Sequence, residues 1–187
     1  MKTIWTKSFF IRFLLISLLV LILGCSTGKV VSDFPQQNKV GIGINKGDIA
    51  PDFALETVDG QFISLSSFQH QKPIVLYFWA TWCPFCKRDF DTLKKVYPSY
   101  KNDVAFIAVD LDLTEGPQII KEYQKKNELT ESGILFALGD ASVLNTYQVH
   151  STTTKFLINR HGIIRYSGSG AQNEQFWHTA LEGLRKE

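Results

Sequence analysis

Two cysteines held two residues apart, Cys83 and Cys86, are the side chains of this sequence best suited to chemistry. Cysteines at this spacing can close a disulfide between themselves and open it again by exchange with another thiol. An apolar run at 74–79 precedes the pair, and a segment with helical spacing follows it. This order predicts a thiol at the start of a helix, where unpaired N–H groups and the helix dipole favour a thiolate. The motif therefore predicts thiol–disulfide exchange.

The pattern of apolar residues predicts the elements that position these cysteines. Apolar and polar residues alternate on both sides of Asp59-Gly60, which predicts a small hairpin. Continuous apolar runs at 74–79 and 104–109 predict strands that are buried on both faces. The helix after the cysteines is expected to end near Tyr97, because Pro98 stops it.

The remaining elements are predicted from the spacing of apolar residues and from the positions of proline and of polar turns. They are a helix opened by Pro117, a short strand at 134–138, a short helix at 141–147, a hairpin of 155–158 with 163–166, and a last helix with an apolar face at 176–184. This order predicts an α/β fold of the thioredoxin-like class, with an N-terminal β-hairpin and a central mixed sheet flanked by helices.

Composition limits the function classes that are open to this chain. Its 187 residues are enough for one ordinary domain and a short extra segment. An apolar content of 44% with 20% charged residues is typical of a globular protein. The net charge is only +2 and no basic cluster is interleaved with aromatic residues, so we expect no nucleic-acid partner. Three cysteines cannot form a disulfide framework, so the pair and the third cysteine need separate explanations.

The first 24 residues have the pattern of a secretory signal. Basic residues at Lys2, Lys7 and Arg12 precede an apolar run at 13–23. This run is short for a membrane-spanning helix, which needs about 20 apolar residues. We therefore expect residues 1–24 to be a signal peptide, residues 25–46 a tether and residues 47–187 the folded domain.

The third cysteine, Cys25, ends a segment that resembles the bacterial lipobox, Ile22-Leu23-Gly24-Cys25. In that motif cleavage precedes the cysteine, and its thiol is lipidated. Several acyl chains would anchor the protein stably and would also remove the odd thiol. The alternative is an uncleaved anchor from about Ile4 to Leu23. Either arrangement places the domain outside the cytoplasm and attached to the membrane.

From Gly47 to Glu187 the chain resembles the TlpA/ResA type of thioredoxin-like proteins, which are membrane-tethered disulfide reductases outside the cytoplasm. The segments that carry the resemblance are Ala50-Pro51-Asp52-Phe53, the Asp59-Gly60 hairpin and Phe78-Trp79-Ala80-Thr81-Trp82-Cys83. The resemblance implies that Cys83 is the attacking thiol and Cys86 the buried thiol that resolves the mixed disulfide. Trp82, Pro84 and Phe85 would then contact the substrate.

Asp89 stands where this family carries an acidic residue near the thiol pair. A carboxylate there would accept the proton of Cys86 when that thiol attacks the mixed disulfide. The alternative is a carboxylate that only stabilises the first turns of the helix through the dipole. Tyr77 occupies the place where cytoplasmic thioredoxins keep a buried aspartate, and Asp91 replaces a proline that the family commonly has.

The clearest departure from the family lies in the loop at 151–154. Thioredoxin folds place a cis-proline there, opposite the cysteines, but this chain has Thr153. A cis bond before a residue other than proline costs ~3–4 kcal/mol, so Thr153 should be trans or be held cis by its surroundings. The resemblance implies that the backbone of this loop, at Thr152 and Thr153, pairs with the bound substrate.

The leading function is thus an anchored thiol–disulfide oxidoreductase, acting as a monomer and without a cofactor on disulfides of exported proteins. The resemblance implies that substrates include apocytochromes c or copper-site proteins, and that a membrane electron donor returns electrons to the pair. The alternative is a copper-delivery protein of similar fold that uses Cys83, Cys86 and His150. Its relatives usually space the two cysteines by three residues, which counts against it.

Two further interpretations of the cysteines have less support in the sequence. A structural zinc site needs four ligands, and the sequence has no second cysteine pair, so we expect no metal. The segment 50–53 also opens peroxiredoxins. Their Thr-x-x-Cys pattern is missing, because Ala80 stands three residues before Cys83.

Overall fold

The computed structural model describes residues 41–187. The expected signal peptide, Cys25 and most of the expected tether lie outside the described residues. The described chain begins with a turn in which the Gly43 amide donates to Ile49 and the Ile49 amide donates to Gly41. A hairpin follows, in which β1 (Ala54–Glu56) pairs antiparallel with β2 (Phe62–Ser64). Gly60 in its turn has φ +79°, which glycine adopts without strain.

The centre of the domain is a five-stranded mixed sheet with the strand order β5-β4-β3-β6-β7. Three strands run parallel: β3 (Ile74–Trp79), β4 (Ala105–Asp110) and β5 (Leu135–Ala137). The antiparallel hairpin of β6 (Thr154–Ile158) and β7 (Ile164–Gly168) joins β3 on its other side. Every residue of β3 and β4 is buried, as their continuous apolar runs predict.

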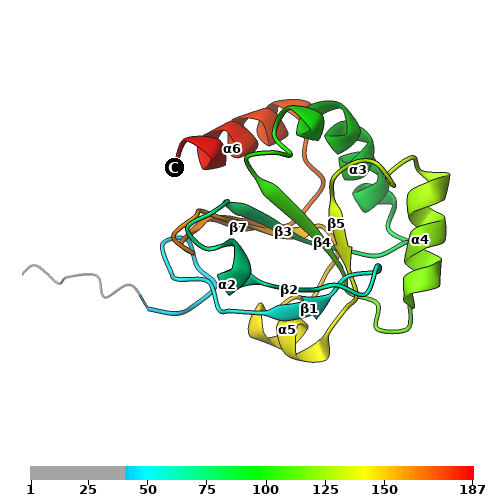
Figure 1. Cartoon of the computed structure of the whole chain (residues 1–187), viewed down its shortest axis with the longest axis horizontal. Coiled ribbons are helices and arrows are strands. Elements are labelled where there is room, and N and C mark those ends of the chain that lie inside the picture. Colours follow the sequence, from blue (N-terminus) through cyan, green and yellow to red (C-terminus); the bar gives the residue numbers. More distant parts are fainter. Residues whose placement is uncertain (1–40) are drawn as a thin grey trace, which may run out of the picture. The chain divides into compact units, whose positions relative to one another are not determined.

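Helices cover both faces of this sheet (Figure 1). One face packs against α3 (Pro84–Val96), α4 (Pro117–Lys126) and α6 (Glu174–Lys186). The other face packs against the hairpin, α2 (Leu65–Phe68) and α5 (Ala141–Thr146). Because side chains alternate along a strand, β3 supplies one core with Val75, Tyr77 and Trp79 and the other with Ile74, Leu76 and Phe78.

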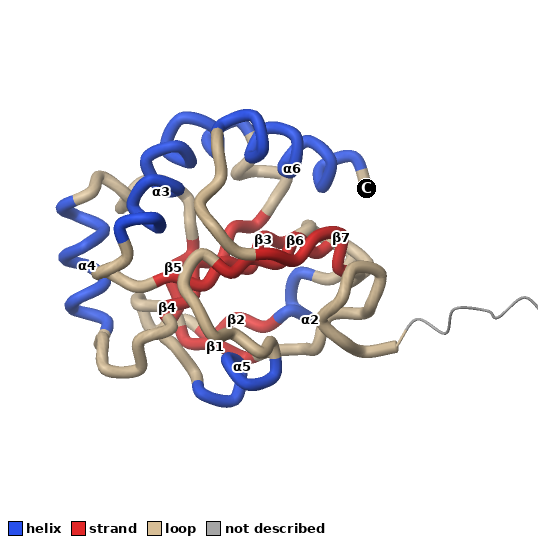
Figure 2. Tube along the Cα trace, turned by 180° about the vertical axis from the view of Figure 1, so that it is seen from behind, coloured by secondary structure: helices blue, strands red, loops and turns tan. Residues whose placement is uncertain are grey.

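The helix that follows the cysteines has clear start and stop signals. Its N-cap is Cys83, and Pro84 occupies the first helical position, where a missing N–H costs nothing. Lys94 and Lys95 lie in its last turn, next to the negative end of the dipole. A 3₁₀ turn, Tyr97–Ser99, follows and contains the proline that was expected to stop the helix. Figure 2 shows α3 and α6 side by side on one side of the sheet.

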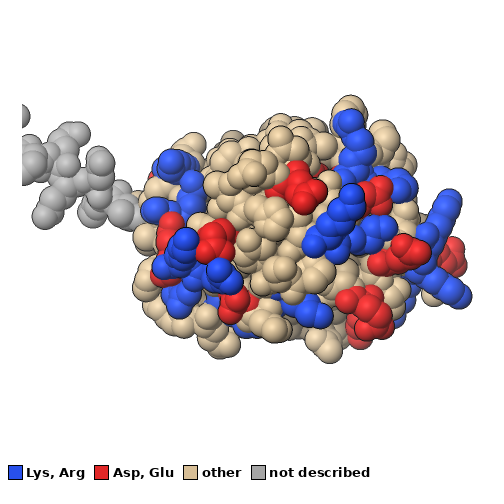
Figure 3. Space-filling view, turned by 90° about the horizontal axis from the view of Figure 1, so that it is seen from above, with Lys and Arg blue, Asp and Glu red and all other residues tan. Residues whose placement is uncertain are grey.

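The structure confirms the predicted α/β thioredoxin-like fold class, including the hairpin and the mixed sheet. Within residues 41–187, no helix is long and apolar enough to cross a membrane. Basic and acidic side chains are interspersed around an uncharged central area on the face seen in Figure 3.

Candidate active site

The two cysteines lie at the start of α3, shortly after the end of β3. Cys83 and Cys86 are joined by a disulfide, with their Cα atoms 5.3 Å apart. The backbone N–H of Cys86 also donates a hydrogen bond of 3.0 Å to the Sγ of Cys83. This is the N-cap interaction of α3, made by a sulfur instead of the usual oxygen. After reduction, the same N–H and the helix dipole would stabilise a thiolate on Cys83.

Both sulfurs are shielded in this disulfide form. Cys83 is 2% exposed and Cys86 is fully buried, so the two residues differ little in exposure in this form. Cys83, bonded to Cys86, belongs to the core that covers one face of the sheet. The residues beside the pair are open to solvent instead. Trp82 is 61% and Phe85 54% exposed, and Pro84 is exposed as well.

Each of these exposed aromatic rings is held by a polar partner. The indole N–H of Trp82 donates a hydrogen bond of 2.9 Å to Asp112. The guanidinium group of Arg88 lies 4.6 Å from the centre of the Phe85 ring, a cation–π contact. Two oriented aromatic surfaces therefore flank the disulfide.

Asp89 lies three residues after Cys86 in α3, so both side chains are on one side of the helix, and both are fully buried. Its carboxylate accepts hydrogen bonds from the Gln172 backbone N–H (2.7 Å), the Tyr77 hydroxyl (2.9 Å) and the Trp177 indole (3.2 Å). A helix-dipole role alone would not require burial or these partners. The carboxylate therefore belongs to a buried hydrogen-bond network beside Cys86.

A buried lysine outside the predicted set of site residues lies beside Asp89. The Nζ of Lys155 is 3.9 Å from Asp89, and both side chains are fully buried. Burial lowers the pKa of Lys155 to about 8, and the charge of Asp89 counteracts this shift in part. Burial raises the pKa of Asp89, while its hydrogen bonds and Lys155 lower it. The site thus contains a buried ion pair one helical turn from Cys86.

Thr153 is trans, since none of the described peptide bonds is cis. Its φ is +63°, a left-handed conformation that is rare for a β-branched residue and costs on the order of 1–3 kcal/mol. Three hydrogen bonds hold it there: its N–H donates to Phe78, its hydroxyl donates to Thr152, and the same hydroxyl accepts from the Gly170 N–H. At the position where thioredoxin folds have a cis-proline, this loop therefore has a threonine with a strained backbone and three hydrogen bonds.

A carboxylate from the β4–α4 loop holds the residues just before the cysteines. Glu115 accepts hydrogen bonds from the backbone N–H of Thr81, at 3.1 Å, and from the Thr81 hydroxyl. The neighbouring Asp110 is fully buried, and one of its carboxyl oxygens has no hydrogen-bond partner within the described part of the chain. Burial and the neighbouring Glu115 raise the pKa of Asp110 to about 8, so its protonated form predominates at neutral pH.

The structure does not bring His150 into a ligand set with the cysteines. His150 is exposed in the loop after α5, and within residues 41–187 no three His, Cys, Asp or Glu side chains are placed to hold one metal ion. The geometry therefore gives the copper-delivery alternative no support.

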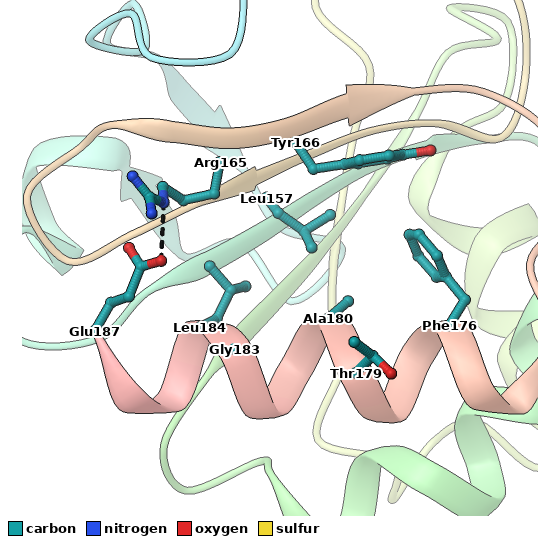
Figure 4. A pocket seen from close by; sticks show the side chains of 9 residues that line it. All are labelled: Leu157, Arg165, Tyr166, Phe176, Thr179, Ala180, Gly183, Leu184 and Glu187. Carbon is teal, nitrogen blue, oxygen red and sulfur yellow. Dashed lines mark hydrogen bonds and ion pairs between the residues drawn. The ribbon is translucent and has the colours of Figure 1, made fainter.

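A cavity of about 230 Å³ lies between β7 and α6, and it contains neither cysteine. Its apolar wall includes Leu157, Tyr166 and Phe176, and an ion pair between Arg165 and Glu187 lies at one end (Figure 4). This cavity is separate from the disulfide and its flanking aromatic rings.

Comparison with known proteins agrees with the disulfide site. The family model described as the AhpC/TSA family matches residues 46–167. The thiol–disulfide oxidoreductase ResA of Bacillus subtilis is 29% identical over 168 residues, which cover 89% of this chain and 90% of that protein. The ResA of Oceanobacillus iheyensis is 31% identical over 162 residues, 83% of this chain and 79% of that protein.

Among solved structures, a putative protein disulfide isomerase from Bacteroides thetaiotaomicron is similar, with a TM-score of 0.66 and 26% identity. The match covers 77% of this chain and 92% of that chain. Fold, disulfide and relatives agree: the chain belongs to the AhpC/TSA family and, within it, to the thiol–disulfide oxidoreductases of the ResA type.

Proposed function

We propose that this protein is a membrane-anchored, extracytoplasmic reductase of protein disulfides, with Cys83 as nucleophile and Cys86 as resolving thiol. The observation that carries the assignment of the two thiols is the hydrogen bond from the Cys86 N–H to the Cys83 sulfur. A donor at the helix start lowers the pKa of a thiol and so increases its thiolate fraction at neutral pH. Cys86 lies one turn further into the helix, and among the described residues no N–H group donates a hydrogen bond to its sulfur.

The reaction begins with the pair reduced. The Cys83 thiolate attacks one sulfur of the substrate disulfide, that S–S bond breaks, and the released substrate thiolate takes up a proton. Asp89 accepts the proton of Cys86. The Cys86 thiolate then attacks the Cys83 sulfur and displaces the second substrate thiolate, which takes up a proton, and Asp89 gives up the proton it accepted. Two electrons pass to the substrate, and the chain is left with the Cys83–Cys86 disulfide.

The substrate surface in this proposal is the area around the cysteines. Trp82, Pro84 and Phe85 are exposed there and would contact apolar residues near a substrate cysteine. Thr152 and Thr153 would contribute the backbone of the opposite loop. The substrates would be exported proteins, including the haem-binding cysteines of apocytochromes c, and a membrane electron donor would reduce the pair again.

The membrane attachment rests on the sequence before the described domain. Residues 1–24 would act as a lipoprotein signal, Cys25 would be lipidated, and residues up to 46 would connect the anchor to the domain. Metabolic labelling with a fatty-acid analogue tests this part, because label on the wild-type protein should disappear in Cys25→Ser. Label that persists in Cys25→Ser would contradict it.

Trapping of the mixed disulfide tests the catalytic roles. Full-length Cys86→Ser should accumulate covalent complexes with substrate proteins that a reductant releases, because the resolving thiol is missing. Cys83→Ser should form none, since the remaining thiol lies one helical turn further in and lacks the N–H donor that would stabilise a thiolate at Cys83. Complexes formed through Cys86 in the Cys83→Ser variant would reverse the assignment.

A further inference from the structure

We infer that Lys155 is a positioning residue for this reaction: its buried ammonium group keeps Asp89 ionised and able to accept the proton of Cys86. The inference rests on the proposed role of Asp89. It starts from a side chain that the catalytic steps above leave unused, a lysine with no exposed surface in the middle of the sheet. A lysine is almost never fully buried unless it is paired.

The position of Lys155 follows from the topology. β6 lies between β3 and β7, and Lys155 faces Tyr77 across the β3–β6 ladder. Its side chain projects to the face covered by α3 and α6, where the ammonium group lies 5.5 Å from the centre of the Tyr77 ring and 5.7 Å from that of Trp177. It also donates a hydrogen bond to the backbone carbonyl of Gly170. The ammonium group is therefore fixed beside the Asp89 carboxylate.

Among residues 41–187, no other charged side chain shifts the pKa of either member of this ion pair. The groups packed against Lys155 and Asp89 are the Tyr77 phenol from β3, the Trp177 indole from α6 and backbone groups of the 169–173 loop. Burial and the neighbouring carboxylate raise the pKa of Tyr77, so the phenol stays neutral. The charge of Lys155 is thus the main one that can stabilise the Asp89 carboxylate.

The consequence for the reaction concerns one proton. A buried carboxyl without a nearby cation favours its neutral form, and a neutral Asp89 cannot accept a proton from Cys86. With Lys155 protonated, the carboxylate is available at neutral pH. Lys155 itself neither gains nor loses a proton in the cycle, so the proton balance of the proposed steps is unchanged.

The test measures the rate at which the mixed disulfide is resolved, in full-length protein, between pH 5 and 9. A reduced variant is mixed with an oxidised peptide, and the second, intramolecular step is followed by rapid quench. The variants are Lys155→Met, Asp89→Asn and the double variant. Lys121→Met, which removes a half-exposed lysine paired with Asp59 on the surface, is the matched control.

We expect Lys155→Met to slow resolution at least about tenfold at pH 6, the effect of one pKa unit, and to recover as the pH rises. The profile of Lys155→Met should be shifted towards higher pH, while Lys121→Met follows the wild type. A Lys155→Met rate that is unchanged, or lowered equally at every pH, would overturn the inference alone. If Asp89→Asn also resolved at the wild-type rate, the proposed role of Asp89 would fail with it.

A second measurement needs no variant. The Asp89 carboxyl carbon of the wild-type protein in its disulfide form, in which neither cysteine titrates, is followed by NMR as the pH rises. Its signal should show an additional inflection near pH 8, where Lys155 loses its proton. A carboxyl signal with no response in that range would show that the lysine charge does not reach Asp89, and would overturn the inference even if Lys155→Met failed to fold.

Discussion

The hydroxyl of Tyr77 lies 2.9 Å from the carboxylate of Asp89, and both side chains are fully buried. Tyr77 stands on β3, directly beneath α3, at the position where cytoplasmic thioredoxins keep a buried aspartate. In this protein the acid comes from the helix and the strand supplies the donor. The strand and helix thus still form one buried polar pair next to Cys86, with the roles of the two elements exchanged.

Replacing Tyr77 by Phe should destabilise the protein by about 1–3 kcal/mol, the usual cost of removing one partner of a buried polar group. The ring and its packing remain, so the loss of stability measures the contribution of the hydroxyl group. The pKa of Asp89 should rise further, because a donor to its charged form is gone. Urea unfolding at neutral pH measures the first effect. Equal stability of Tyr77→Phe and wild type would show that the hydrogen bond contributes nothing.

The loop that faces the cysteines depends on the hydroxyl of Thr153. Thr153→Val keeps the branched shape but leaves the Gly170 N–H without its partner, so we expect a loss of about 1–3 kcal/mol. Thr153→Ser keeps the hydroxyl and is the matched control, with a smaller loss. Urea unfolding of both variants makes the comparison. A larger loss in Ser than in Val would contradict this account.

Thr153→Pro should be more damaging than Thr153→Val. Proline fixes φ near −65° and cannot adopt the observed +63°, and it lacks the N–H that donates to Phe78. The loop would have to change its conformation to accept it. A Thr153→Pro variant as stable as the wild type, with an unchanged amide NMR spectrum for residues 168–172, would contradict the observed conformation.

Asp110 should make stability depend on pH. Its pKa is about 8 in the folded protein and near 3.8 in the unfolded chain, so the folded state binds the extra proton between these values. Stability should therefore fall as the pH rises from about 4 to about 8. Asp110→Asn does not titrate, and its unfolding midpoint in urea should change less between pH 5 and 8. Parallel pH profiles for the variant and the wild type would contradict the assignment.

The exposed aromatic rings should affect the binding of protein substrates rather than the stability of the fold. Trp82→Ala and Phe85→Ala should each change the free energy of unfolding little, as substitutions of exposed residues usually do. Both should raise KM for an oxidised protein substrate several-fold, because a contact surface beside Cys83 is lost. A small disulfide that cannot reach the rings should be reduced at the wild-type rate. Equal effects on both substrates would point to damage to the cysteines instead.

Local patterns were enough to predict the scaffold and the reactive pair. The apolar run at 74–79, the Asp59-Gly60 turn and the prolines at helix starts depend on neighbours in the sequence, and the structure follows them. The cysteine spacing likewise indicates its chemistry directly. Asp89 was singled out because the family that the sequence resembles carries an acidic residue at that place.

The partners of Asp89 could not be predicted in this way, because they come from distant segments. Lys155 begins the apolar stretch Lys155-Phe156-Leu157-Ile158 and could be taken for the exposed start of a strand. Only the pairing of β6 between β3 and β7 buries it. One signal was available: a lysine directly before an unbroken apolar run, in a strand expected to lie inside the sheet, needs a buried counter-charge.

The reduction potential of the Cys83–Cys86 pair tests the central claim most directly. The full-length protein is equilibrated with a dithiothreitol or glutathione series, and the fraction of disulfide is measured at each ratio. A reductase should have a potential near that of thioredoxin, about −270 mV. A value near −120 mV, typical of a strong oxidant such as DsbA, would mean that the protein forms disulfides and would contradict the proposed direction.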